Sequence, residues 1–326
     1  MKTLYQMSDN ALAAGEEARS NYIAAIASSS DLLGVLPFLD VAGGAYIYVG
    51  EGQLSGVAFE GDEPNVGDGI LNPRVEGLKV LCGDLEVDPG LLKTHGPGVR
   101  KMSETMKARA LGAYLTNAII NGDPLSSEVP SGLKHRIIQG QHKRLDGAPL
   151  SQEALNNAID TVDGPTHLLV GTTLRDWLAA SGWLTDGINE QGVRALFYSY
   201  PSGDGVIRLP VLNVSADPFG VPIIGYDEPD NTSSVYVVNL GDTGVCGLQN
   251  DMPDYSDLGE CPYHEMPRKS AVQIILDMGG FGERNGEPIV PATVLRGRAE
   301  WLASFGVLSG RAAARLSGIA EGRPAA

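Results

Sequence analysis

The spacing of hydrophobic and polar residues changes along the chain, and each change predicts a different kind of element. Residues 8–30 place small apolar side chains at helical spacing after the candidate N-caps Ser8 and Asp9, which predicts one helix. Residues 1–38 offer few large apolar side chains to bury, so we expect an arm rather than a domain. Residues 45–49 then combine β-branched and aromatic side chains, which predicts a strand.

That strand begins an extended hairpin that is predicted to run to about residue 87. Its return side is expected at residues 78–82 and 85–87, with glycines recurring between the two sides. Residues 51–88 hold nine acidic and two basic residues, a net charge of −7. A two-stranded ribbon is marginal by itself in water, so this ribbon needs a surface on which to lie.

One strongly helical segment, residues 98–121, follows the hairpin and would be roughly 36 Å long. Its predicted apolar stripe consists of Val99, Met102, Met106, Ala110, Ala113 and Ala118, widened by Leu111, Tyr114, Leu115 and Ile119. Four cations fall largely off this stripe, namely Arg100, Lys101, Lys107 and Arg109. Residues 93–144 carry nine Lys or Arg and three acids, a net charge of +6, so a basic helix and loop directly follow the acidic hairpin.

From Ser151 onward, helices and strands alternate in the manner of an α/β unit. Ser151 is predicted to cap a helix through Val162, and a buried strand at 166–170 precedes a helix capped by Thr173. Short strands are expected at 206–214, 222–224, 235–240 and 293–301, a strand or a short helix at 270–278, and a last segment at 312–319. Together with the hairpin and the long helix, this order predicts an α+β fold.

Composition and charge narrow the classes of function. The chain has 326 residues, which leaves room for two or three folding units. Hydrophobic residues make up 43% of it, which is enough for a core. A net charge of −16 disfavours a nucleic-acid-binding protein, whose surface is normally basic. Three cysteines indicate no disulfide framework. The N-terminus does not resemble a signal peptide, and no apolar run is long enough to predict a membrane span.

Candidate catalytic chemistry is sparse, and we expect no enzyme, catalytic residue, cofactor or metal. The sequence lacks a phosphate-binding loop, a dinucleotide fingerprint and a nucleophile elbow. The best metal candidate is the set Cys246, Cys261 and His264, with Asp254, Asp257 and Glu260 nearby in an acidic loop at residues 251–264. Zinc normally requires a second close pair of ligands, so a solvated loop is expected, and a metal-dependent hydrolase stays an alternative.

Charge complementarity is the strongest physical signal in the sequence. If the long helix supports the base of the ribbon, the tip of the ribbon would lie over the helix of a neighbouring copy. The predicted contact joins acids of the tip to cations of the helix: Glu60, Asp62 and Glu63 to Arg100, Lys101, Lys107 and Arg109. Each exposed pair contributes only ~0–1 kcal/mol, but many copies add and fix the register. Simple solvation of both faces is the alternative.

The ordered set of elements resembles the major capsid proteins of tailed bacteriophages, the Hong Kong 97 fold family. The resemblance rests on the arm, the extended loop near 50–77, the helix, and the phrase from Asn121-Gly122-Asp123 to Pro130-Ser131-Gly132-Leu133. Thr172–Trp177, Ser233–Gly241 and the stretch from Arg298 to Ile319 also match the family. It implies five parts: an N-terminal arm (1–44), an extended loop (45–92), a spine helix and peripheral domain (93–133), an α/β axial domain (134–290), and a peripheral return strand with tail (291–326).

The resemblance implies a structural subunit that forms pentamers and hexamers of an icosahedral virion shell around double-stranded DNA, assembled in the host cytoplasm. The implied partners are other copies, a portal, a scaffolding protein and an optional cement protein, with no membrane. Two features depart from some relatives: residues 50–78 contain no Lys for a loop cross-link, and the hairpin begins near residue 45, so we expect a separate scaffold. An encapsulin-like nanocompartment, which encloses enzymes, is the main alternative.

Overall fold

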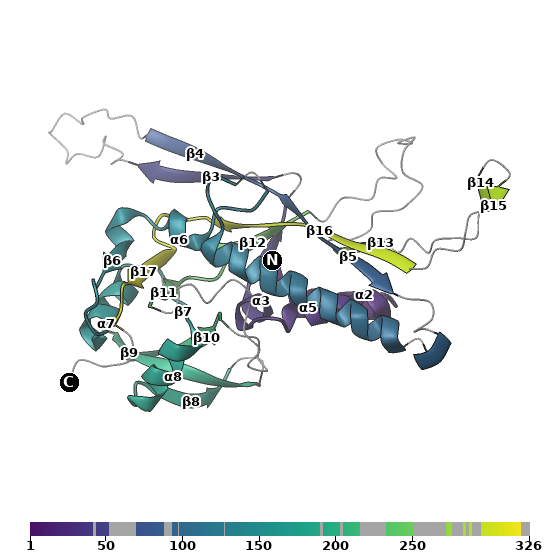
Figure 1. Cartoon of the computed structure of the whole chain (residues 1–326). Helices are drawn as coiled ribbons and strands as arrows, with labels where there is room; N and C mark the ends of the chain where they lie inside the picture. Colours follow the sequence, from purple (N-terminus) through teal and green to yellow (C-terminus); the bar gives the residue numbers. More distant parts are fainter. Residues whose placement is uncertain are drawn as a thin grey trace.

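Two β-sheets and a long helix organise the computed structural model (Figure 1). The structure describes residues 1–41, 44–51, 70–87, 93–96, 98–126, 128–189, 192–202, 205–215, 233–250, 272–275, 283–284, 287–288 and 295–320. Within these residues, no helix combines the length and the apolar character that a membrane crossing requires. The mixture of helices and strands confirms the predicted α+β class.

The first sheet has six strands drawn from distant parts of the sequence. Its order is β1-β2-β12-β16-β13, and β5 also pairs with β16. The strands are β1 (Lys2–Thr3), β2 (Pro37–Asp40), β5 (Lys79–Val87), β12 (Val245–Gln249), β13 (Val272–Ile275) and β16 (Leu295–Val307). The long strand β16 pairs antiparallel with β5, β12 and β13, so it holds this sheet together.

The N-terminal region is part of the core, which corrects two expectations. Instead of one helix at 8–30, the chain forms α1 (Leu4–Ala13), α2 (Glu17–Ala27) and α3 (Asp31–Val35). The break between α1 and α2 contains Gly15, whose φ of +81° lies in the left-handed region that favours glycine. Large apolar side chains do become buried here, including Leu4, Ile23, Ile26, Leu32, Leu33 and Phe38, each at most 1% exposed.

The predicted long helix is confirmed as α5 (Gly98–Asn121), but its buried face differs from the predicted stripe. All of its buried residues lie from Ala108 onward, and the contact with the core follows Leu111, Leu115 and Ile119. Met102 and Met106 are 66% and 63% exposed, because α2 and β5 cover the other side of the helix. The predicted position of the helix is therefore confirmed. The predicted buried face is wrong in the N-terminal half, where Met102 and Met106 are exposed.

The second sheet has seven strands in the order β6-β17-β11-β7-β10-β9-β8. They are β6 (His142–Arg144), β7 (His167–Val170), β8 (Leu184–Ile188), β9 (Arg194–Ser202), β10 (Gly205–Asn213), β11 (Val235–Val238) and β17 (Ala313–Ser317). Two helices belong to this unit, α7 (Gln152–Asp160) and α8 (Thr172–Ala180). Ser151 caps α7 as predicted, its Oγ accepting from the backbone N of Ala154, whereas α8 starts after Gly171 without the predicted side-chain cap from Thr173.

The second sheet lies between two hydrophobic cores. Along β11, Tyr236 and Val238 join the core built with α2, α5 and the first sheet, while Val235 and Val237 join the core built with α7 and α8. This alternation follows from the two-residue period of a strand. Because both faces are covered around β11 and β17, this part of the sheet is fixed firmly to the rest of the chain.

The C-terminal strand β17 lies in the second sheet, between β6 and β11. The resemblance had placed residues 291–326 with the peripheral part, and β12 with the axial part, whereas β12 pairs in the first sheet. Each sheet thus recruits strands across the proposed boundaries. The division into five parts stays a prediction, and the predicted strand at 222–224 falls outside the described residues.

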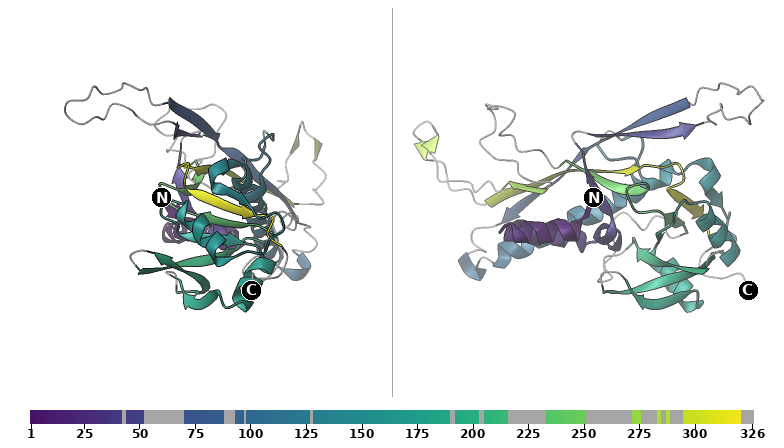
Figure 2. Two further views of the ribbon diagram at one scale, coloured as in Figure 1. Left: turned by 90° about the vertical axis from the view of Figure 1, so that its left-hand side faces the viewer. Right: turned by 180° about the vertical axis from the view of Figure 1, so that it is seen from behind.

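The extended ribbon consists of β3 (Gly44–Glu51) and β4 (Ile70–Gly77), paired antiparallel from Gly44 opposite Gly77 to Glu51 opposite Ile70. It projects from the rest of the subunit in all three views (Figures 1 and 2). The strands predicted at 78–82 and 85–87 are confirmed as the single strand β5, but their place on the return side of the ribbon is wrong, because β5 pairs with β16 and β4 pairs with β3. Four short elements remain: α6 (Leu133–Arg136), the 3-10 helix η1 (Gln139–Gln141), β14 (Glu283–Arg284) and β15 (Glu287–Pro288).

Candidate assembly surfaces

A buried arginine fixes the base of the ribbon. Arg136 on α6 makes a two-pronged ion pair with Glu76 on β4, with Nη1–Oε1 at 2.5 Å and Nη2–Oε2 at 2.7 Å. Its Nε donates to the carbonyl oxygen of Ser131 at 2.5 Å, and its guanidinium lies 4.3 Å from the ring centroid of Phe305 on β16. Planar, bidentate pairing of this kind sets direction as well as position. The ribbon therefore leaves the subunit at a defined angle.

The loop after α5 places Arg136 by means of two glycines in close contact. The Gly132 backbone N donates to the Gly122 carbonyl oxygen at 2.8 Å. A Cβ on Gly122 would lie 2.0 Å from the carbonyl oxygen of Pro130, and a Cβ on Gly132 would lie 2.4 Å from the backbone N of Gly122. Only glycine fits at both positions, which gives a physical reason for the phrase from Asn121 to Gly132.

The four predicted helix cations divide into two pairs. The Arg100 Nε lies 2.9 Å from Glu104 Oε1, one turn along α5. The Lys107 side chain packs beneath β5, since a Cβ on Gly83 would lie 3.1 Å from its Cδ. Lys101 and Arg109 are exposed. The predicted partners Glu60, Asp62 and Glu63 lie outside the described residues, so the contact between tip and helix stays a prediction.

An apolar strip on α5 also faces outward. Met102, Met106 and Tyr114 are 66%, 63% and 52% exposed, and Ala110 between them is exposed. These residues follow one another at four-residue intervals and therefore share one face of the helix. The sequence analysis assigned Met102 and Met106 to the core, whereas the buried face of α5 carries Leu111, Leu115 and Ile119. Exposed apolar strips of this size are typical of surfaces that contact other proteins.

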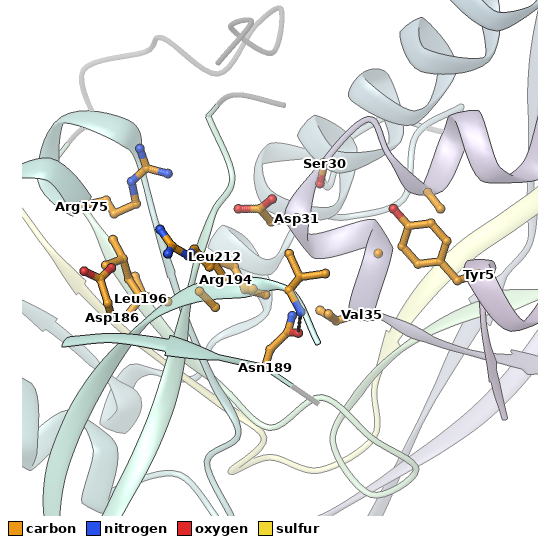
Figure 3. Close-up of a pocket in the computed structure, with 15 residues that line it drawn as sticks. Tyr5, Ser30, Asp31, Val35, Arg175, Asp186, Asn189, Arg194, Leu196 and Leu212 are labelled. Carbon is orange, nitrogen blue, oxygen red and sulfur yellow. Dashed lines mark hydrogen bonds between the residues drawn. The ribbon is translucent and has the colours of Figure 1, made fainter. Parts of the chain in front are cut away.

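A cleft separates the N-terminal helices from the second sheet (Figure 3). Its volume is about 360 Å³, and Tyr5 and Val35 on one side face Arg194 and Leu196 on the other. Beside the cleft, Asp31 Oδ2 accepts from the backbone N of Asn213 at 3.0 Å and so ties α3 to β10. No sequence pattern pointed to this cleft, because its walls come from segments more than a hundred residues apart.

Burial shifts the pKa values of one cysteine and one histidine, Cys246 and His167. Burial raises the pKa of the Cys246 thiol to about 12, with Asp242 adding to the effect, so this thiol stays protonated. Burial also lowers the pKa of His167 to about 4. Within the described ranges, no three His, Cys, Asp or Glu side chains gather as metal ligands would. Of the predicted metal ligands, Cys246 is buried in β12, and Cys261 and His264 fall in 251–271, outside those ranges, so the structure does not test the complete set.

The arrangement of N-terminal helices, ribbon, long helix and two sheets is that of the Hong Kong 97 capsid fold, as the sequence resemblance implied. No family model and no curated protein matches the sequence.

Among solved structures, the chain is similar to the SrpI encapsulin of Synechococcus elongatus PCC 7942 at 15% identity and a TM-score of 0.56, covering 90% of this chain and 89% of that one. The capsid of a native GTA particle matches at 12% identity and a TM-score of 0.56, with 90% of each chain covered. A structure from Mycobacterium phage Bobi matches at 13% identity and a TM-score of 0.52, over 88% of this chain and 90% of that chain. At these identities the similarity establishes the fold.

Proposed function

We propose that this chain is the structural subunit of a closed protein shell. The observation that carries the proposal is the extent of the fold match, since encapsulin and capsid subunits align over about nine-tenths of both chains. An enzyme that shared only one domain with shell proteins would align with their structures over only part of its chain. In its finer form, the proposal is a phage major capsid protein whose pentamers and hexamers enclose double-stranded DNA in an icosahedral virion, assembled in the host cytoplasm with a portal and a scaffolding protein.

Two surface features support self-association. The ribbon is anchored at its base by Arg136 and Glu76 and extends away from the rest of the chain (Figure 2). Little of the surface of the same chain is therefore available to support it. The α5 strip of Met102, Met106 and Tyr114 is apolar and exposed. Burying both features against neighbouring copies would remove apolar area from water and would order the ribbon.

The charged contact that we propose joins the ribbon tip of one copy to α5 of the next. Lys101 and Arg109 are its best-placed cations because both are exposed on α5. Glu60, Asp62 and Glu63 would supply the opposite charge. Such pairs contribute little singly but set the register when repeated through a ring of subunits.

An encapsulin-like compartment is the second candidate, favoured by the match to the SrpI encapsulin at the same TM-score as the GTA capsid. Both candidates predict a shell, and they differ in its contents. Nuclease-protected nucleic acid inside purified particles would favour a phage capsid, and a co-purified enzyme would favour a compartment.

Sedimentation of the purified chain, with electron microscopy of the same sample, tests the shell proposal. Closed particles or rings of several hundred kilodaltons or more are expected, alone or with a co-expressed scaffold. A monomer or dimer at every concentration, and with genes from its own neighbourhood co-expressed, would contradict it.

A further inference from the structure

The two faces of the ribbon differ in chemistry. Residues directly opposite each other in an antiparallel pair share a face, and so do residues two apart along one strand. The register of β3 and β4 therefore assigns every residue of the ribbon to one of two faces. The apolar face has no charged residue and consists of Gly44, Tyr46, Tyr48, Gly50, Leu71, Pro73, Val75 and Gly77. The mixed face consists of Ala45, Ile47, Val49, Glu51, Ile70, Asn72, Arg74 and Glu76.

The ion pair at the base shows which face is turned toward the chain itself. Glu76 belongs to the mixed face, and its carboxylate pairs with Arg136 on α6, where both side chains are largely buried. At the base of the ribbon, the mixed face is therefore turned toward α6 and the apolar face away from it. Beyond the base, the ribbon projects from the rest of the chain (Figures 1 and 2). The chain itself thus offers the apolar face little to pack against.

An uncharged face with two tyrosines is unfavourable in water. Tyr46 and Tyr48 occupy successive positions on it, and tyrosine is among the residues with the largest apolar surface. A two-stranded ribbon is also marginal by itself, because it has no packed core of its own. Burial of the apolar face against a partner would remove this area from water and order the ribbon at the same time.

The exposed strip on α5 is a surface of matching chemistry and length. Met102, Met106 and Tyr114 are 66%, 63% and 52% exposed. Methionine adapts to irregular surfaces, and its sulfur makes favourable contacts with aromatic rings. From Met102 to Tyr114 the strip extends over about 18 Å at the rise of an α-helix. The paired part of the ribbon extends over about 26 Å at the rise of a strand, so it is long enough to cover the strip.

We propose that the apolar face of the ribbon packs on the α5 strip of a second copy of this chain, with Tyr46 and Tyr48 against Met102 and Met106. The inference rests on the proposed function and deepens it, because it names the apolar contact that supplies affinity between neighbouring subunits. The charged contact between the ribbon tip and α5 then sets the register of the same interface. Each copy carries both surfaces, and such a head-to-tail contact builds rings when its rotation closes.

A second copy fits the strip better than the ribbon of the same chain does. The anchor on α6 lies beside the C-terminal end of α5, and from there the ribbon extends away from the rest of that helix (Figure 1). Its apolar face therefore does not meet the strip of its own chain.

The ribbon also fits the strip better than a second α5 does. The helix carries four cations and one acid, so two such helices would bring like charges together. The apolar face of the ribbon has no charge, and the segment 51–69 that follows β3 has five acids and no Lys or Arg. A ribbon can therefore lie on this basic helix without repulsion.

Assembly of ribbon variants tests the role of the apolar face. Tyr46→Ser with Tyr48→Ser removes both aromatic rings of that face, whereas Ile47→Ser with Val49→Ser truncates two residues of the mixed face on the same strand. Sedimentation and electron microscopy give the protein concentration at which each full-length variant forms shells or rings. We expect the tyrosine pair to raise this concentration roughly tenfold or more, and the control pair to raise it by less than about threefold.

Photo-cross-linking identifies the surface that the apolar face touches. A benzophenone-bearing amino acid in place of Tyr48 should cross-link to the α5 peptide that contains Met102 and Met106. The same probe in place of Ile47 should not. Assembly from a mixture of isotope-labelled and unlabelled copies shows whether the link joins two copies. Links only within one chain, or to a surface other than α5, would overturn the proposed partner.

The outcomes separate this inference from the proposed function. Equal effects of the two serine pairs would overturn the inference, because the two faces would then contribute alike. Shells that the tyrosine variant forms at an unchanged concentration would contradict the apolar contact and leave the shell function standing. The absence of any shell or ring from the wild type, with a co-expressed scaffold as well, would contradict the proposed function and the inference with it.

Discussion

Arg136 and Glu76 form a bidentate ion pair in which the two side chains are 6% and 17% exposed, and this pair joins α6 to the base of the ribbon. Removing the carboxylate charge leaves a buried guanidinium without its counter-ion, which is costly even though the intact pair itself adds little net stability. We expect Glu76→Gln to lower the free energy of unfolding by about 2–4 kcal/mol, as measured by denaturant titration of the full chain.

The matched control for this prediction is Glu104→Gln, which breaks the Arg100–Glu104 pair on the surface of α5, where the side chains are 32% and 25% exposed. Its expected cost is about 0.5 kcal/mol. Similar costs for the two substitutions would show that burial of the Arg136 pair has no special effect.

Gly112 sets the distance between α2 and α5. A Cβ at this position would lie 2.0 Å from Ser29 Oγ and 2.9 Å from the carbonyl oxygen of Ile26. Gly112→Ala must therefore push the two helices apart and disturb the hydrogen bond that Ser29 Oγ donates to Ile26. We expect a loss of about 2–3 kcal/mol in unfolding free energy, despite the higher helix propensity of alanine.

Gly98 provides the control, because it lies at the start of the same helix with open space around it. Gly98→Ala should be neutral or stabilise the protein by up to about 1 kcal/mol. A loss at Gly98 as large as that at Gly112 would point to backbone conformation rather than helix packing as the cause.

The elements that the sequence predicted well are those with strong local periodicity. The 24 residues of α5 and the capped helix after Ser151 carry their signals within a few turns. The ribbon strand β4 was missed because it carries Pro73, and proline is rare inside strands. Arg136 and Glu76 lie 60 residues apart, and nothing near either one marks the other as its partner. The assembly surface was thus only partly predictable.

His167 gives the stability a dependence on pH. Burial lowers its folded-state pKa to about 4, against 6.5 for an unperturbed histidine. As the pH falls, His167 becomes protonated near pH 6.5 in the unfolded chain but only near pH 4 in the folded chain. The free energy of unfolding therefore decreases as the pH falls through this window. The loss from this one group is roughly 2–3 kcal/mol.

Replacement by a side chain that does not titrate isolates this contribution. His167→Gln will lower the free energy of unfolding at pH 7. The difference in unfolding free energy between the variant and the wild type should narrow steadily from pH 7 to pH 4 in denaturant titrations. A constant gap across that range would mean that His167 is protonated equally in both states.

The proposed contact between the acidic ribbon tip and α5 predicts that charge reversal blocks assembly. In the triple variant Glu60→Lys, Asp62→Lys and Glu63→Lys, the tip would meet Lys101 and Arg109 of the next copy with like charge, which costs more than the loss of the attraction alone. We expect sedimentation to show subunits or small oligomers in place of shells, with an unchanged thermal transition of the subunit itself.

A second set of reversals decides whether the two surfaces meet. If they do, adding Lys101→Glu and Arg109→Glu to the triple variant restores opposite charges across the contact, and shells should return at least in part. Reversal of three exposed acids elsewhere, Asp9, Glu153 and Asp186, changes net charge by the same amount and should leave assembly intact. Shells that form normally in the triple variant would remove the tip from the interface. A contact between opposite charges stays attractive when the signs on both sides are exchanged. Failure of Lys101→Glu and Arg109→Glu to restore assembly would therefore place the acids against some other surface.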